Sequence, residues 1–81
     1  MGREYKILCT PVKGAALQQL LHRLPPPFQR PQMHEIYNYR VDEDGYYLID
    51  HLVDRSVAAS GLQILLDAAL STGKPVTVVE L

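Results

Sequence analysis

Histidine and tyrosine are the side chains of this sequence that are best suited to acid–base chemistry. His51 ends a run of aromatic and aliphatic residues, and Tyr37, Tyr39 and Tyr47 precede it within fifteen positions. An imidazole titrates near neutral pH, and a phenol can donate or accept a proton in an apolar cleft. The sequence therefore leaves open a small dimeric enzyme whose cleft is lined by these four residues. A half-buried, hydrogen-bonded His51 with no catalytic role is the interpretation that we favour.

Nucleophilic and metal-dependent chemistry have less support. Cys9 is the only cysteine, which excludes an internal disulfide, fits a reducing compartment and predicts an inert thiol beside Ile7 and Leu8. The three histidines do not show the spacing of a metal site. The acidic segment 42–45, Asp-Glu-Asp-Gly, lacks the rest of a calcium loop and fits a turn better. We expect no metal and no cofactor.

The segment from Met33 to Val53 predicts a β-hairpin around this turn. Two runs that are rich in β-branched and aromatic residues flank residues 42–45, which end in Asp-Gly. Alternation places Tyr37, Tyr39 and Val41 on one face of the first strand, and we expect this face to point to the core. The second strand is apolar on both faces, which is typical of a central strand.

Strand and helix patterns lie on both sides of the hairpin. Residues 5–10 predict a first strand, and Thr10-Pro11 predicts the start of a helix that must end before Pro25. Asp54 predicts the cap of a second helix that ends at Gly73. Residues 76–81 predict a last strand. Residues 25–32, with three consecutive prolines, predict an extended, stiff connecting loop.

The element order β-α-β-β-α-β predicts an α+β fold. Right-handed crossovers over one sheet give a ferredoxin-like plait, in which four antiparallel strands carry two helices on one face. The first and third strands are then central. Eighty-one residues allow one domain, so we expect residues 1–81 to form a single unit.

Binding is expected on the sheet face that the helices leave uncovered. We place Tyr46, Leu48, Asp50 and Leu52 there, and add Phe28 and Arg30 from the proline-rich loop. An apolar face of this width is seldom left in water. The sequence therefore predicts a small non-catalytic module that binds a second copy of itself, another protein or a small apolar ligand. A homodimer packed face to face or edge to edge is the simplest form.

RNA binding and membrane insertion are disfavoured. RNA-recognition domains share the predicted strand order, but Asp44 stands where they carry a basic residue and Leu48 where they carry an aromatic one. The net charge of −1 also gives no attraction to phosphate. Apolar runs are too short to span a bilayer, and the first residues are too polar for a secretory signal. We therefore expect a cytoplasmic protein.

Overall fold

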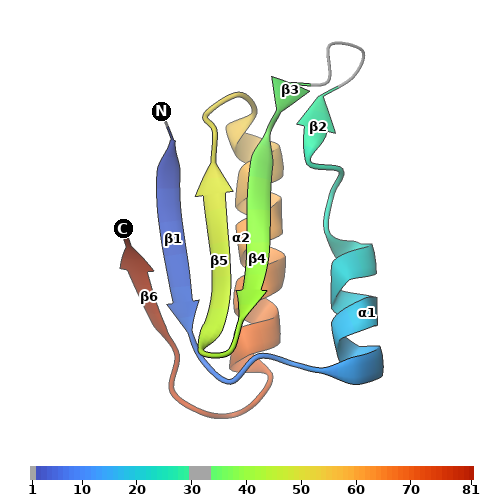
Figure 1. The fold of residues 1–81 in the computed structure, drawn as a ribbon, viewed down its shortest axis with the longest axis vertical. Helices are drawn as coiled ribbons and strands as arrows, with labels where there is room; N and C mark the ends of the chain where they lie inside the picture. The colour runs from blue at the N-terminus through green and yellow to red at the C-terminus, as the bar shows by residue number, and fades with distance from the viewer. Residues whose placement is uncertain (1, 30–33) are drawn as a thin grey trace.

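The computed structural model describes residues 2–29 and 34–81. In chain order their elements are β1 (Arg3–Leu8), α1 (Gly14–Arg23), β2 (Phe28–Gln29), β3 (His34–Glu35), β4 (Tyr37–Asp42), β5 (Gly45–Asp50), α2 (Arg55–Leu70) and β6 (Thr77–Glu80). Four strands form an antiparallel sheet in the order β4-β5-β1-β6 (Figure 1). The predicted α+β class, with four antiparallel strands and two helices, is confirmed. The separate two-stranded ladder of β2 and β3 was not expected.

The predicted hairpin is formed by β4 and β5. Asp42 pairs with Gly45 across a turn of two residues, Glu43 and Asp44. Gly45 has a φ of 146°, and a Cβ at this position would lie 1.8 Å from the carbonyl oxygen of Ile7 in β1. A side chain would therefore push the turn off the neighbouring strand. Met33, the expected start of the hairpin, lies outside the described residues.

The two helices differ in how well their starts were predicted. Asp54 caps α2 as expected, since its carboxylate accepts a hydrogen bond from the Val57 N–H at 3.2 Å. The expectation that Thr10 starts the first helix is wrong, because α1 begins only at Gly14. The Val12 N–H instead donates to the hydroxyl of Tyr46 at 2.9 Å, which ties this part of the chain to β5.

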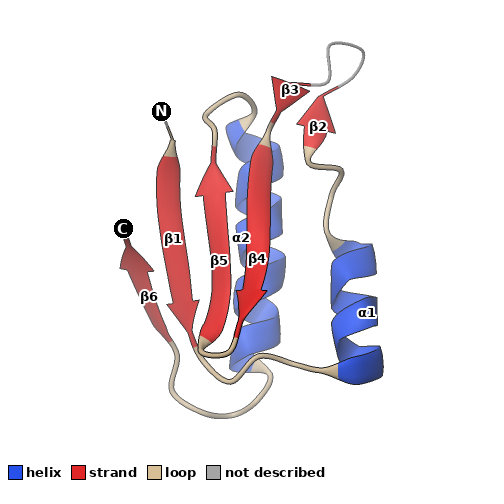
Figure 2. Ribbon diagram, in the orientation of Figure 1, coloured by secondary structure: helices blue, strands red, loops and turns tan. Residues whose placement is uncertain are grey.

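The core lies between the sheet and the helices. It contains the side chains of Ile7, Leu20, Ile36, Tyr37, Tyr46, Leu48, Ala58, Leu65, Ala68 and Ala69. Figure 2 shows α2 running behind β5 and β4, with α1 beyond β4, so that in the described chain β6 has no helix behind it. The helix layer is thus displaced toward the β4 edge of the sheet.

The uncovered face of the sheet is largely polar. Register and alternation place on it Glu4, Lys6 and Leu8 of β1, Asn38, Arg40 and Asp42 of β4, Tyr47 and Ile49 of β5, and Thr77 and Val79 of β6. The prediction that Tyr46 and Leu48 lie on this face is wrong. Tyr46 pairs with Val41 and Leu48 with Tyr39, and directly opposed residues point to the same side, here the helix side.

Candidate functional site

The four residues of the hypothetical enzyme cleft lie on opposite sides of the sheet. Tyr37 and Tyr39 point to the helix side, with ring centroids 6.3 Å apart. Tyr37 is fully buried and donates from its hydroxyl to the carbonyl oxygen of Pro25 at 2.5 Å, and burial raises its pKa to about 12. Tyr47 and His51 belong to the other side. The structure therefore does not bring these residues together in one cleft.

His51 is held by hydrogen bonding at the end of β5. Its Nε2 lies 2.5 Å from the side-chain oxygen of Asn38 and 3.6 Å from a carboxylate oxygen of Glu35. These contacts fix the ring against β4 and the start of the hairpin. The arrangement matches the hydrogen-bonded histidine that we favoured, and His51 does not line either of the two hollows described below.

Tyr47 lies at the centre of the uncovered face. Its hydroxyl donates to a carboxylate oxygen of Glu4 at 2.6 Å, and the Arg40 guanidinium carbon lies 4.5 Å from its ring centroid. The hydrogen bond to Glu4 raises the pKa of Tyr47, and burial adds to this effect. A phenol with a raised pKa is a poorer base, and its proton is already engaged. Tyr47 is thus a structural link between β5, β1 and β4.

A charge cluster surrounds the hairpin turn. The Lys6 ammonium lies 2.5 Å from Asp42 and 2.8 Å from Asp44, and the Nε of Arg40 lies 2.7 Å from Asp42. Hydrogen bonds from Arg40 and then Lys6 lower the pKa of Asp42 to about 2, and the two carboxylates raise that of Lys6. Each charge of the cluster is matched by a neighbour, so the cluster holds the hairpin turn to β1.

The four predicted binding residues from β5 and the loop after it have different environments. Tyr46 and Leu48 are in the core. Asp50 is only 5% exposed. One of its oxygens accepts from the Leu52 N–H at 2.8 Å, and the other lies 3.7 Å from Arg55. Leu52 alone among these four residues is exposed.

Hydrogen bonds to the carbonyl oxygens of Pro25 and Pro27 fix the proline-rich loop to the domain. The Ile36 N–H donates to the carbonyl oxygen of Pro27 at 2.7 Å, and Tyr37 binds that of Pro25. Phe28, in β2, remains 39% exposed. The second loop residue predicted to bind, Arg30, lies outside the described residues.

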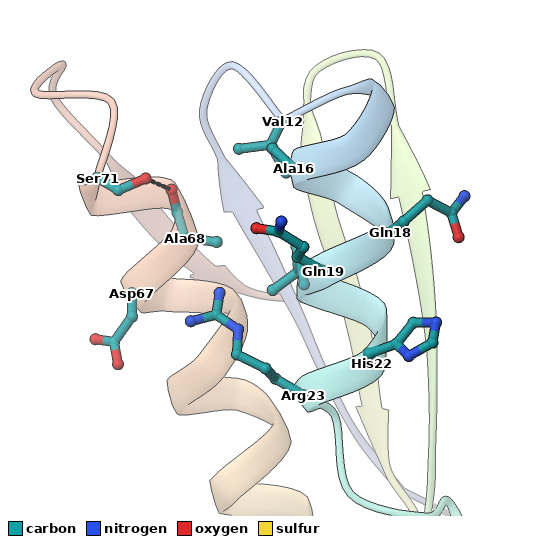
Figure 3. Close-up of a pocket in the computed structure, with 10 residues that line it drawn as sticks. Val12, Ala16, Gln18, Gln19, His22, Arg23, Asp67, Ala68 and Ser71 are labelled. Carbon is teal, nitrogen blue, oxygen red and sulfur yellow. Dashed lines mark hydrogen bonds between the residues drawn. The ribbon is translucent and has the colours of Figure 1, made fainter.

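A groove of about 650 Å³ separates α1 from α2. Gln19 and Arg23 of α1 extend toward α2, whereas Gln18 and His22 point away from it (Figure 3). On the α2 side of the groove, the Ser71 hydroxyl donates to the carbonyl oxygen of Ala68 in the last turn of the helix, at 2.6 Å. Among the described residues, no hydrogen bond joins a nucleophile that lines the groove to a base that lines it.

Exposed apolar residues outside the predicted binding set lie in the edge strand β6. All four of its residues are exposed, including Val78 at 46% and Val79 at 38%. Val78 is opposite Ile7 and so points to the helix side, while Val79 points to the uncovered face. In segment 76–81 apolar residues occur on both faces of the strand. This pattern is typical of a strand buried on both sides, but in the structure the segment forms an edge strand of the sheet.

We use the name trough for a set of apolar residues on the helix side: Tyr5 of β1 and Val78 of β6, which the register places on this side, and Leu62, Leu66 and Leu70, which recur every four residues in α2. Residues four apart share a flank of a helix, and a hollow of about 480 Å³ lined by Tyr5 and Leu62 places this flank next to β1. Leu70 is 54% exposed. The displaced helix layer thus leaves apolar surface uncovered beside the edge strand.

No protein-family model, curated protein or solved structure matches this chain. Within residues 2–29 and 34–81, no three or more His, Cys, Asp and Glu side chains are grouped to hold a metal ion. No helix in the same part of the chain has the length and apolar character required to cross a bilayer.

Proposed function

We propose that this protein is a small binding module that self-associates through the outer edge of β6. The observation that carries the proposal is the exposure of this strand on both faces, with valine on each. Natural sheets protect their edges with lysine, proline or bulges. β6 itself (Thr77–Glu80) contains neither lysine nor proline; its one charged residue, Glu80, is at its end, and its ladder with β1 is continuous.

The architecture that we propose is the ferredoxin-like plait. Its support is the strand order β4-β5-β1-β6, in which the strands that follow the two helices, β4 and β6, occupy the edges. In such a fold two helices normally share one face of the sheet. The displacement of α2 toward β4 then leaves β6 to be covered by something outside the subunit.

Edge pairing replaces the face-to-face contact as the mode of association. The uncovered face is polar and its charges are matched within the chain, so packing two such faces would desolvate ion pairs for little gain. Pairing two edges satisfies main-chain groups that water now solvates, and it also brings apolar trough residues from two subunits together.

The mass of the protein in solution tests the proposal. Sedimentation equilibrium at micromolar concentration should give twice the mass of one chain. Val78→Lys should give the mass of a single chain, because a charge at the centre of the edge opposes pairing. Val53→Lys is the matched control, since Val53 is 44% exposed and far from β6 in the sequence.

Circular dichroism must show that both variants keep the native helix content. A single-chain mass for the wild-type protein throughout the micromolar range would overturn the proposal. Equal dimer masses for the two lysine variants would also overturn it, because the contact would then lie elsewhere.

A further inference from the structure

The hydrogen-bonding phase of β6 determines which main-chain groups a partner strand can reach. The Leu81 N–H donates to the carbonyl oxygen of Glu4 in β1 at 2.9 Å. In an antiparallel ladder hydrogen-bonded pairs alternate, so Thr77 and Val79 also direct their main-chain groups toward β1. The N–H and C=O groups of Val78 and Glu80 therefore point to the free edge.

The trough restricts how two copies can pair. The troughs meet only if both subunits have their helices on the same side of a continuous eight-stranded sheet. Directly opposed residues then point to the same side, so a twofold axis must pass through a residue and not between two residues. Within β6 the axis can therefore pass through any of four residues. An axis at Glu80 would set the two Glu80 carboxylates opposite each other, which is unfavourable, so Thr77, Val78 and Val79 remain.

Only one of these three registers matches side chains of the same kind. With the axis at Val78, Val76 faces the partner's Glu80, and with the axis at Val79, Val78 faces the partner's Glu80. With the axis at Thr77, Val76 faces the partner's Val78. Lys74 then comes opposite the partner's Glu80, which joins two opposite charges at each end of the paired strands.

The register requires residues 74–76 to continue the strand in the dimer. In the single subunit they precede β6, beyond the Leu8–Thr77 pair that ends the ladder with β1; Lys74 lies in a bend and Val76 is partly buried against the core. Pro75 comes opposite the partner's Val79. This is a position whose main-chain groups point away from the partner, so the missing N–H of proline removes no bond between the subunits.

We infer that two copies of this chain form a twofold dimer in which the β6 strands pair antiparallel about Thr77. The inference rests on the proposed self-association and names its geometry. Val76 and Val78 of each subunit form the apolar centre on the helix side, next to Leu70. The Lys74 and Glu80 ion pairs fix the ends, and the two Thr77 side chains meet on the uncovered face.

Disulfide trapping reads out the register directly. Opposed residues that are not hydrogen-bonded to one another have Cα atoms about 4.5 Å apart, which is within the range of a disulfide. In a Cys9→Ser background, Thr77→Cys should oxidise to a covalent dimer. The variants Val78→Cys and Val79→Cys should remain monomers on a non-reducing denaturing gel, since each residue is displaced along the strand from the same residue of the partner.

The outcomes separate the inference from the proposal beneath it. Crosslinking at Val78→Cys or Val79→Cys in place of Thr77→Cys, with the dimer mass retained, overturns the register and leaves self-association standing. A single-chain mass for the uncrosslinked background protein, together with no crosslink at any of the three positions, overturns both.

A charge exchange provides an independent test. Lys74→Glu and Glu80→Lys should each raise the dimer dissociation constant, by about fivefold for two exposed ion pairs. The double variant should recover much of the loss, because the opposite charges face each other again; recovery is not complete, because Glu80→Lys also removes the contact of Glu80 with Arg3 at 4.0 Å. Failure of the double variant to recover would contradict the Thr77 register.

Discussion

The carboxylate of Asp50 accepts a hydrogen bond from the backbone N–H of Leu52 at 2.8 Å, and Leu52 has a φ of 64°. A left-handed conformation is rare for a residue with a branched side chain. The chain needs it here to leave β5 and reach the cap of α2 within a few residues. The buried carboxylate thus stabilises a strained turn, which explains an acidic residue in the core without assigning it a ligand.

Removing this acceptor should destabilise the fold. We expect Asp50→Ala to lower the free energy of unfolding by about 2 kcal/mol, because a hydrogen bond to a charged group is lost and a small cavity forms. Asp50→Asn keeps an oxygen for the Leu52 N–H and should cost about 1 kcal/mol. Urea denaturation measures both. Equal losses would show that the hydrogen bond contributes little.

The conformation of Leu52 gives a second prediction. Leu52→Gly and Leu52→Ala remove the same exposed side chain, but only glycine adopts a positive φ without strain. The glycine variant should be more stable than the alanine variant by about 1 kcal/mol. Thermal and urea denaturation of the pair make the comparison, and the reverse order would contradict the strained turn.

The side of the sheet on which Tyr46 lies could have been predicted from the sequence. The turn signal at residues 42–45 was interpreted correctly, and a two-residue turn sets the register of the whole hairpin. One step back from Asp42 is Val41, and one step forward from Gly45 is Tyr46, so these two residues are opposite each other. The alternation of the first strand had already assigned Val41 to the core. The error came from assigning the faces of the two strands separately.

The exposure of β6 could not have been predicted in this way. Periodicity predicts α2 and its small residues, but not where the helix lies across the sheet. That position depends on the close approach of Gly61 to Tyr37 and Leu48, which draws α2 toward β4 and β5. Val78 is exposed as a consequence, although its own sequence neighbourhood is typical of a buried strand.

The contact between Gly61 and Tyr37 gives a third prediction. In an exposed helix Gly→Ala gains about 1 kcal/mol. A Cβ at Gly61, however, would lie 3.2 Å from a carbon of the buried Tyr37 ring. Gly61→Ala should therefore lower the free energy of unfolding by about 1–2 kcal/mol, as expected for an overpacked core.

A double-mutant cycle tests the cause of this loss. Tyr37→Phe removes the hydroxyl that binds the Pro25 carbonyl and should cost about 1 kcal/mol. In that background the ring can shift, so the cost of Gly61→Ala should fall by at least about 0.5 kcal/mol. Strict additivity of the two substitutions, measured by urea denaturation, would show that the hydroxyl does not hold the ring in place.

The cluster at the hairpin turn predicts a dependence of stability on acid. Hydrogen bonds from Arg40 and Lys6 hold the pKa of Asp42 at about 2, below the value of 3.8 for an unperturbed carboxyl. The folded state therefore favours the ionised form. This contribution is fully present above about pH 4 and is lost as the pH falls toward about 2.

Comparison of the wild type with Asp42→Asn isolates this contribution. The wild type should be more stable at neutral pH, and the difference in free energy of unfolding should shrink between about pH 4 and 2. Asp67→Asn is the control for the loss of one carboxylate, because Asp67 forms no ion pair within the described part of the chain. A difference for Asp42→Asn that stays constant down to pH 2 would show that the ionised carboxylate does not hold the turn to β1.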